Sequence, residues 1–260
     1  MEDILDLSGR VALITGASSR GIGSGAAKKL AAHGAKVFLL ARREEQLEEQ
    51  AAEIEKAGGE ADYAVCDVSK EEECANAVKA CVDKFGRLDI MVLAAGISGD
   101  YTDEAEDYDF DVDDWNNVLG INLFGQYYMY KYGWEHIAKN GVGSIIQISS
   151  MAALKVSGGL PYTASKGALL RMVPWLARRL GRHGIRVNAI CPGLIDTDMT
   201  NPPGWDTTEM LHKPAAEKAP LRRCATIDDC ANAILFLASD AARCITGVHV
   251  PVDGGEALIP

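Results

Sequence analysis

A tyrosine and a lysine four residues apart, Tyr162 and Lys166, are the residues whose types and spacing point most directly to chemistry. On a helix this spacing places both side chains on one face, one turn apart. An ammonium group beside a phenol stabilises the phenolate and lowers the tyrosine pKa from its free value of about 10. Such a tyrosine can exchange a proton with an alcohol or a carbonyl near neutral pH. A solvated helix face can show the same spacing, so its meaning depends on the rest of the chain.

A glycine-rich segment near the start of the chain is the second pattern with chemical meaning. It joins the apolar run 11–14 to a helical pattern over 21–33, which stops at Gly34, and it reads Thr15-Gly16-Ala17-Ser18-Ser19-Arg20-Gly21-Ile22-Gly23. Glycines at a strand-to-helix turn let the backbone approach a pyrophosphate, whose charge is stabilised at the helix N-terminus. We therefore predict a dinucleotide site at this turn.

Short apolar runs alternate with longer helical patterns along the chain. The predicted strands are 11–14, 37–40, 61–66, 90–95, 144–149, 186–191 and 248–252. Near-continuous apolar strands with helices between them are typical of a parallel sheet covered on both faces. No linker-like stretch or internal repeat divides the chain. We predict one α/β domain over residues 1–260, a Rossmann-type doubly wound parallel sheet of about seven strands with helices on both faces.

Composition excludes several classes of function. The 260 residues are 48% hydrophobic, carry a net charge of -11 and have a pI near 4.9, which argues against nucleic acid or an anionic membrane as partner. The acidic start lacks a secretory pattern, and no apolar run is long enough to span a bilayer. The seven cysteines show no disulfide or metal-ligand spacing. We therefore expect free buried thiols, no metal site and a cytoplasmic protein.

The order of these motifs resembles the short-chain dehydrogenase/reductase family, in its branch with Tyr-x-x-x-Lys, over essentially the full chain. Besides the glycine turn and the Tyr162–Lys166 pair, the matching pieces are Asp67-Val68, Asn122 in Ile121-Asn122-Leu123-Phe124-Gly125, Ser149-Ser150, Pro192-Gly193 and Val252-Asp253-Gly254-Gly255. Two departures concern the cofactor. The glycine turn has one residue more than is usual in the family. The family's N-N-A-G reads Leu93-Ala94-Ala95-Gly96 here, so polar support beneath the cofactor is expected to be weaker.

The resemblance implies a catalytic set of Asn122, Ser150, Tyr162 and Lys166. Tyr162 would be the general acid/base, Lys166 would lower its pKa, and Asn122 would support a water relay to Lys166. The serine is ambiguous, because the strand pattern assigns its role to Ser150 while the family's usual spacing to the tyrosine points to Ser149. Successive strand residues face opposite ways, so one of the two is expected to reach the site. We favour Ser150.

The resemblance also implies a set of cofactor-binding residues: Gly16, Ser19, Arg20, Gly21, Ile22, Gly23, Arg42, Asp67, Val68, Ala95, Gly96, Tyr162, Lys166, Pro192, Gly193, Ile195 and Thr197. An enzyme of this fold that uses NAD places a carboxylate at the end of the second strand. Here that position is Ala41, and arginines follow it. Arg20 and Arg42 could bind a 2′-phosphate, which favours NADP(H). NAD(H) stays possible if Arg42 and Arg43 pair with acidic residues of the next helix.

The substrate side is less defined. Residues 198–221 resemble the family's substrate lid, with Met199, Trp205, Met210 and Leu211 as apolar candidates. Met151, Leu154, Leu160 and Pro161 could complete a pocket for an apolar or cyclic carbonyl compound, with steroid-like compounds among the candidates. The acidic segment 99–114 is interpreted as a solvated loop; the alternative is that it repels anionic substrates or favours cationic ones.

Pro174 lies inside a helical pattern over 163–180, where it removes a backbone donor. We therefore predict a kink between 170 and 174. In the family this helix commonly builds a homodimer or homotetramer interface.

The leading hypothesis is a reductase or dehydrogenase that transfers a hydride between NADP(H) and a ketone or secondary alcohol. A cofactor-binding sensor or scaffold without turnover is the alternative from another class, although a binder needs no tuned tyrosine. An enoyl reductase is disfavoured, because that branch separates its tyrosine and lysine by more than one helical turn.

Overall fold

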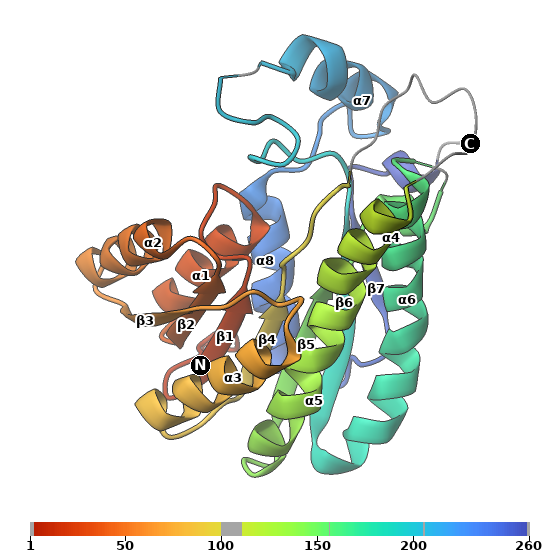
Figure 1. The fold of residues 1–260 in the computed structure, drawn as a ribbon. Coiled ribbons are helices and arrows are strands. Elements are labelled where there is room, and N and C mark those ends of the chain that lie inside the picture. Colours follow the sequence, from red (N-terminus) through yellow and green to blue (C-terminus); the bar gives the residue numbers. More distant parts are fainter. Residues whose placement is uncertain (1–2, 100–110, 156, 205, 259–260) are drawn as a thin grey trace.

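The computed structural model describes residues 3–99, 111–155, 157–204 and 206–258, and it contains one parallel sheet (Figure 1). The strand order is β3-β2-β1-β4-β5-β6-β7. All seven runs predicted as strands form strands: β1 (Val11–Thr15), β2 (Lys36–Ala41), β3 (Glu60–Val65), β4 (Ile90–Leu93), β5 (Gly143–Ile148), β6 (Ile185–Pro192) and β7 (His249–Val252). The predicted Rossmann-type, doubly wound sheet is confirmed.

Helices connect the strands and cover both faces of the sheet (Figure 1). They are α1 (Ile22–Ala32), α2 (Glu44–Lys56), α3 (Glu71–Phe85), α4 (Val112–Leu119), α5 (Gly125–Ala138), α6 (Leu160–Leu180), α7 (Lys213–Lys218) and α8 (Ile227–Ala238). Buried side chains of α1, α2 and α8 form one core with the sheet, and those of α3, α5 and α6 form the other. Two π-helical turns, Gly120–Phe124 and Thr208–His212, interrupt the α-helical pattern.

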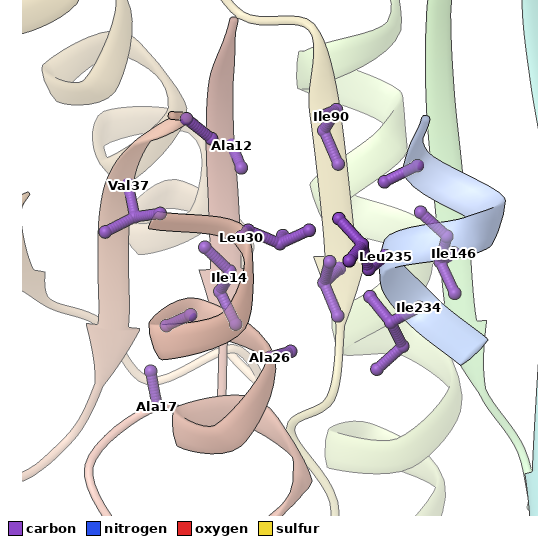
Figure 2. Packing of buried hydrophobic residues seen from close by; sticks show 14 of the residues in the cluster. Ala12, Ile14, Ala17, Ala26, Leu30, Val37, Ile90, Ile146, Ile234 and Leu235 are labelled. Carbon is purple, nitrogen blue, oxygen red and sulfur yellow. The ribbon is translucent and has the colours of Figure 1, made fainter. Parts of the chain in front are cut away.

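The core beneath α1 and α8 shows how apolar spacing is converted into packing (Figure 2). Ala26 and Leu30, one turn apart on α1, are fully buried beside Ile14 of β1, and Ile234 and Leu235 of α8 join the same cluster. Helix α1 ends where the sequence predicted, because Gly34 adopts a φ of 91° that favours glycine. This packing holds the N-terminus of α1 at the carboxyl end of β1.

The sheet topology determines where a ligand can bind. The chain runs outward from β1 to β2 and β3, then returns to β4 on the other side of β1. Crevices in such sheets lie outside the carboxyl ends of the strands, at the point where the strand order reverses. That point lies between β1 and β4, directly at the glycine turn.

Helix α6 passes through Pro174 without interruption, from Leu160 to Leu180. A proline cannot donate a hydrogen bond to the carbonyl four residues earlier, which here belongs to Leu170. His249 of β7 replaces that bond, since its Nε2 lies 2.8 Å from the Leu170 carbonyl oxygen. The oxygen can only accept, so Nε2 carries the hydrogen. The helix is therefore continuous through Pro174. The predicted bend of its axis between 170 and 174 stays a prediction.

The structure also tests the expectations about the cysteines, a membrane-spanning segment and a metal site. All seven cysteines are free, but Cys244 is exposed and Cys224 is only partly buried, so the prediction of buried thiols was wrong at these two residues. No helix in the described ranges is long and apolar enough to cross a membrane. Across those same ranges, no three metal-ligating side chains are grouped so that they could hold an ion. Residues 100–110 and Trp205 of the predicted acidic segment and lid lie outside the described part.

Candidate active site

Two adjoining cavities open at the carboxyl ends of the central strands. One, of about 280 Å³, lies at the ends of β1, β2 and β3, and the other, of about 180 Å³, extends to Tyr162 and Lys166. Gly16, Ser19 and Gly96 line both, so the cavities form one crevice. The crevice brings together most of the predicted cofactor residues: Gly16, Ser19, Ile22, Gly23, Arg42, Asp67, Val68, Ala95, Gly96, Tyr162, Lys166, Pro192, Gly193, Ile195 and Thr197.

The glycine turn has no room for larger side chains. A Cβ on Gly16 would lie 2.9 Å from the backbone of Ala94, and Gly16 itself has a φ of 68°. A Cβ on Gly23 would lie 2.4 Å from the Gly16 carbonyl oxygen. Helix α1 begins at Ile22, with Gly21 as its N-cap. Bare backbone facing a helix N-terminus suits a pyrophosphate, so the residues present fit a dinucleotide.

The hydroxyl of Thr15 supports the segment where the family's asparagines are missing. Thr15 Oγ1 accepts hydrogen bonds from the backbone N–H groups of Ala94 and Ala95, each at 3.0 Å. The loss of polar support expected from the alanines is therefore partly compensated by a residue outside that motif. Sequence reasoning missed Thr15, although its place directly before Gly16 was a usable signal.

Arg20 does not take the position predicted for it. It lies in the glycine turn but does not line the crevice. Its guanidinium lies 2.9 Å from Asp196 Oδ1 and 3.4 Å from Asp198 Oδ1, and its backbone N–H and carbonyl both bond to Asp198. The hydrogen bond from Arg20 lowers the pKa of Asp196. The prediction that Arg20 faces a 2′-phosphate was wrong, because the two carboxylates that follow β6 hold its side chain.

The end of β2 carries no carboxylate. Ala41, Arg42 and Arg43 line the crevice there, and Arg43 Nη2 lies 3.4 Å from Ser18 Oγ. Nearby, Asp67 accepts hydrogen bonds from the backbone N–H and the hydroxyl of Ser69, at 3.0 and 2.7 Å. Burial opposes ionisation of Asp67, but these bonds dominate and lower its pKa. Asp67 therefore stabilises a turn and lines the crevice at the same time.

The two serines have different surroundings. The hydroxyl of Ser150 acts on Tyr162 so as to lower the pKa of the phenol, and its Oγ accepts from the backbone N–H of Ala152 at 3.0 Å. Ser149 instead donates from its hydroxyl to the Lys166 carbonyl oxygen, at 2.9 Å. The geometry therefore supports Ser150 as the partner of Tyr162. Ser149 instead stabilises the packing of α6 against the end of β5.

Exchanging each serine for alanine separates these roles. We expect Ser150→Ala to lower kcat/KM by about 100-fold, because it removes a donor beside the reacting oxygen. Ser149→Ala is expected to lower the free energy of unfolding by about 1 kcal/mol with a smaller effect on turnover. Steady-state kinetics and urea unfolding of both variants measure these effects. A larger loss of kcat/KM in Ser149→Ala would reverse the assignment.

Lys166 is buried, and its Nζ donates to the Ile148 carbonyl oxygen at 3.0 Å while lying 5.5 Å from the ring centre of Tyr162. Burial lowers the pKa of Lys166 to about 8. Burial also raises the pKa of Tyr162, and the hydrogen bond from Ser150 opposes that rise. In the protein alone, the pKa of Tyr162 is therefore raised and not lowered as the spacing predicted, because burial disfavours the charged phenolate.

Asn122 lies fully buried in the π-helical turn and holds the neighbouring segment in place. Its Nδ2 donates to the Ile97 carbonyl at 2.9 Å and to Ser165 Oγ at 3.1 Å, and its Oδ1 accepts from Ile97 N–H at 2.8 Å. Ser165 in turn donates to the Tyr162 carbonyl at 2.7 Å. Ser165 was missed from the sequence, although it stands within the Tyr162–Lys166 motif. Through these bonds Asn122 positions the backbone of Ile97 and the hydroxyl of Ser165. Its role in a water relay to Lys166 stays a prediction.

A third cavity, of about 500 Å³, adjoins Tyr162 on the side away from the glycine turn. Met151, Leu194, Met199 and Leu211 give it apolar walls. Leu154, Leu160, Pro161 and Met210 do not line it, so their assignment to a pocket was wrong; Pro161 is buried, and the other three are exposed. Five residues line both this cavity and the crevice: Ser150, Tyr162, Gly193, Met199 and Thr200.

The chain belongs to the short-chain dehydrogenase/reductase family. A family model described as "Enoyl-(Acyl carrier protein) reductase" matches residues 16–256. The chain is 39% identical to (+)-borneol dehydrogenase 2 of Salvia officinalis, covering 96% of this chain and 90% of that one.

Solved structures extend the similarity. A 7α-hydroxysteroid dehydrogenase complexed with NADH and 7-oxo glycochenodeoxycholic acid has a TM-score of 0.88, 32% identity and coverage of 98% and 97% of the two chains. A gluconate 5-dehydrogenase from Burkholderia cenocepacia J2315, in complex with NADP and tartrate, has a TM-score of 0.90, 30% identity and 99% coverage of both. The protein is therefore an oxidoreductase of a nicotinamide-dependent family that acts on alcohols and ketones.

Proposed function

We propose that this protein is an NADP(H)-dependent enzyme that interconverts a neutral, apolar or cyclic ketone and its secondary alcohol. The observation that carries the proposal is that Tyr162 and Ser150 line both the dinucleotide crevice and the third cavity. A group that touches both spaces can act on a substrate oxygen while the carbon beside it faces the cofactor. The residues 198–221, which include Met199 and Leu211, would form a lid over that cavity.

The chemistry follows from these positions. A nicotinamide cofactor, when bound, supplies or accepts the hydride at the substrate carbon. Negative charge then develops on the substrate oxygen during reduction. Tyr162 would donate its phenolic proton to that oxygen, and the hydroxyl of Ser150 would hydrogen-bond to it. Lys166, with its pKa near 8 and its Nζ beside the Tyr162 ring, would stabilise the phenolate that remains.

A panel of ketones tests the activity directly. Purified protein with NADPH is expected to reduce neutral cyclic ketones, measured as loss of cofactor absorbance, and NADH is expected to be a poorer donor. Absence of turnover with every steroid, quinone, sugar and aliphatic ketone would overturn the enzymatic proposal and favour a cofactor-binding scaffold.

Arg42 tests the cofactor preference. Its position beside Ala41 and Arg43 supports a phosphate contact. Arg42→Ala is therefore expected to raise the KM for NADPH by about 10-fold to 100-fold, with a much smaller change for NADH. Arg20→Ala is the matched control, because Arg20 pairs with Asp196 and Asp198; it is expected to affect both cofactors alike. Equal changes for both cofactors in Arg42→Ala would contradict NADP(H) preference.

The assembly and compartment belong to the same proposal. Trp175 of α6 is exposed, with the Arg179 guanidinium 5.0 Å from its ring centre. We assign this helix face to a homodimer or homotetramer contact, which light scattering of the purified protein measures. The free thiols favour a reducing cytoplasm, and the acidic composition argues against nucleic acid or an anionic membrane as partner.

A further inference from the structure

The C-terminal turn places a carboxylate in the wall of the third cavity. Asp253 is buried, and its side chain accepts from the backbone N–H groups of Gly255 and Ala257, at 2.9 and 2.7 Å. The Glu256 N–H bonds to the Asp253 carbonyl at 3.1 Å. These bonds fix the short helical turn Glu256–Leu258, and Glu256 lines the cavity together with Tyr162 and Ser150. The Val252-Asp253-Gly254-Gly255 motif thus positions a residue of the substrate side.

Glu256 also lies next to the boundary between the cavity and the crevice. A Cβ placed on Gly193 would lie 3.3 Å from Glu256 Oε2 and 2.9 Å from Asp253 Cβ. Gly193 lines both spaces. The glycine therefore leaves room for the carboxylate at the boundary between the third cavity and the crevice.

A single ammonium group balances this carboxylate from the other side. Lys155 Nζ lies 3.4 Å from Glu256 Oε1 and 3.3 Å from the Glu256 carbonyl oxygen, and both side chains are largely buried. Lys155 does not line the cavity. Among the described residues that do, Glu256 alone has a fully charged side chain; the others are apolar, glycine or hydroxyl-bearing. The cavity thus offers a strong hydrogen-bond acceptor, Oε2, whose charge is already compensated.

We propose that Glu256 selects neutral substrates that carry a second hydroxyl group, as in hydroxyketones and the corresponding diols. This inference rests on the proposed ketone–alcohol activity and specifies its substrate class. A hydroxyl donating to a carboxylate forms one of the stronger hydrogen bonds available to a neutral ligand. A substrate carboxylate at the same place has no hydrogen to donate to Oε2, and the two acceptor groups would face each other, so it is disfavoured. A ketone without a second polar group cannot form this hydrogen bond to Oε2.

Three ketones of one ring size test this selection: 4-hydroxycyclohexanone, cyclohexanone and 4-oxocyclohexanecarboxylate. The wild type with NADPH is expected to show kcat/KM values in that order, with the first two differing by about 10-fold. Glu256→Gln keeps the shape but removes the charge. We expect it to lower the hydroxyketone-to-ketone ratio by about 5-fold and to raise the ketoacid-to-ketone ratio by at least as much. Glu49→Gln, an exposed residue of α2, is the control for net charge and is expected to change neither ratio.

Binding without turnover separates this inference from the proposed function. Calorimetry with the NADP⁺-loaded protein is expected to give tighter binding of trans-1,4-cyclohexanediol than of cyclohexanol, and Glu256→Gln is expected to reduce that difference. If the diol binds in this way but no ketone is reduced, the proposed function fails and the inference holds. If Glu256→Gln changes all three substrates equally, or the diol binds no better than cyclohexanol, Glu256 has only a structural role and the inference is overturned.

Discussion

Tyr162→Phe is expected to lower kcat by about 10³-fold or more, the largest loss of turnover expected from removing one oxygen atom in this chain. In the proposed mechanism the phenolic oxygen would give a proton to the substrate oxygen, since Tyr162 lines both the crevice and the third cavity. The ring, which packs beside Lys166, stays in place in the variant. The substrate oxygen would therefore develop charge with only Ser150 as a donor, and the barrier would rise.

The matched control is Tyr127→Phe. Tyr127 is exposed on α5, and its ring packs edge-on against Tyr130, so loss of its hydroxyl is expected to leave kcat within about 2-fold. Circular dichroism and the Kd for NADPH, measured by fluorescence, should match the wild type in both variants. A Tyr162→Phe enzyme that keeps a tenth of the wild-type kcat would exclude Tyr162 as the general acid/base.

The fold could be predicted from the sequence because strand and helix patterns agree with the topology at each step. The runs that became β1 and β4 are apolar except for Thr15 at the end of β1, and in a sheet covered on both faces each of their residues packs on one side or the other. The glycine turn was equally readable, since Gly16 and Gly23 meet backbone atoms where any larger residue would clash. Local pattern and global packing give the same answer here.

Other parts of the site depend on partners far away in the sequence. Arg20 is held by Asp196 and Asp198, and nothing near Arg20 indicates that pairing. His249 likewise supplies the hydrogen bond that Pro174 cannot donate to Leu170.

The pKa of Tyr162 could not be predicted from the sequence for a different reason. The four-residue spacing places Lys166 beside Tyr162, but the desolvation that raises the pKa of Tyr162 exists only once α6 is packed against the sheet.

Lys166→Met is expected to lower kcat by about 100-fold or more while it makes the protein more stable. Burial lowers the pKa of Lys166 from 10.5 to about 8, so the folded protein binds this proton less tightly than the unfolded chain does. Below about pH 8 both states hold the proton, and the full penalty of about 3 kcal/mol weighs against folding. The variant removes that penalty but leaves the Ile148 carbonyl without its donor, which costs about 1 kcal/mol. We therefore expect a net gain of about 1–2 kcal/mol near neutral pH.

The pH dependence identifies the cause of this gain. As pH rises from about 8 toward about 10.5, the folded wild type releases the proton while the unfolded chain keeps it, so the penalty falls and the wild type approaches the variant. Urea unfolding at about pH 6.5 and about pH 9.5 is expected to show the advantage of Lys166→Met shrinking by about 2 kcal/mol. Lys139→Met, an exposed residue after α5, serves as control, and its effect should not change with pH in this range. An advantage of equal size at both pH values would mean that better apolar packing, and not relief of a buried charge, stabilises the variant. A Lys166→Met protein less stable than the wild type at pH 6.5 would contradict the lowered pKa itself, and Lys166 would then be a charge that the fold stabilises before any cofactor binds.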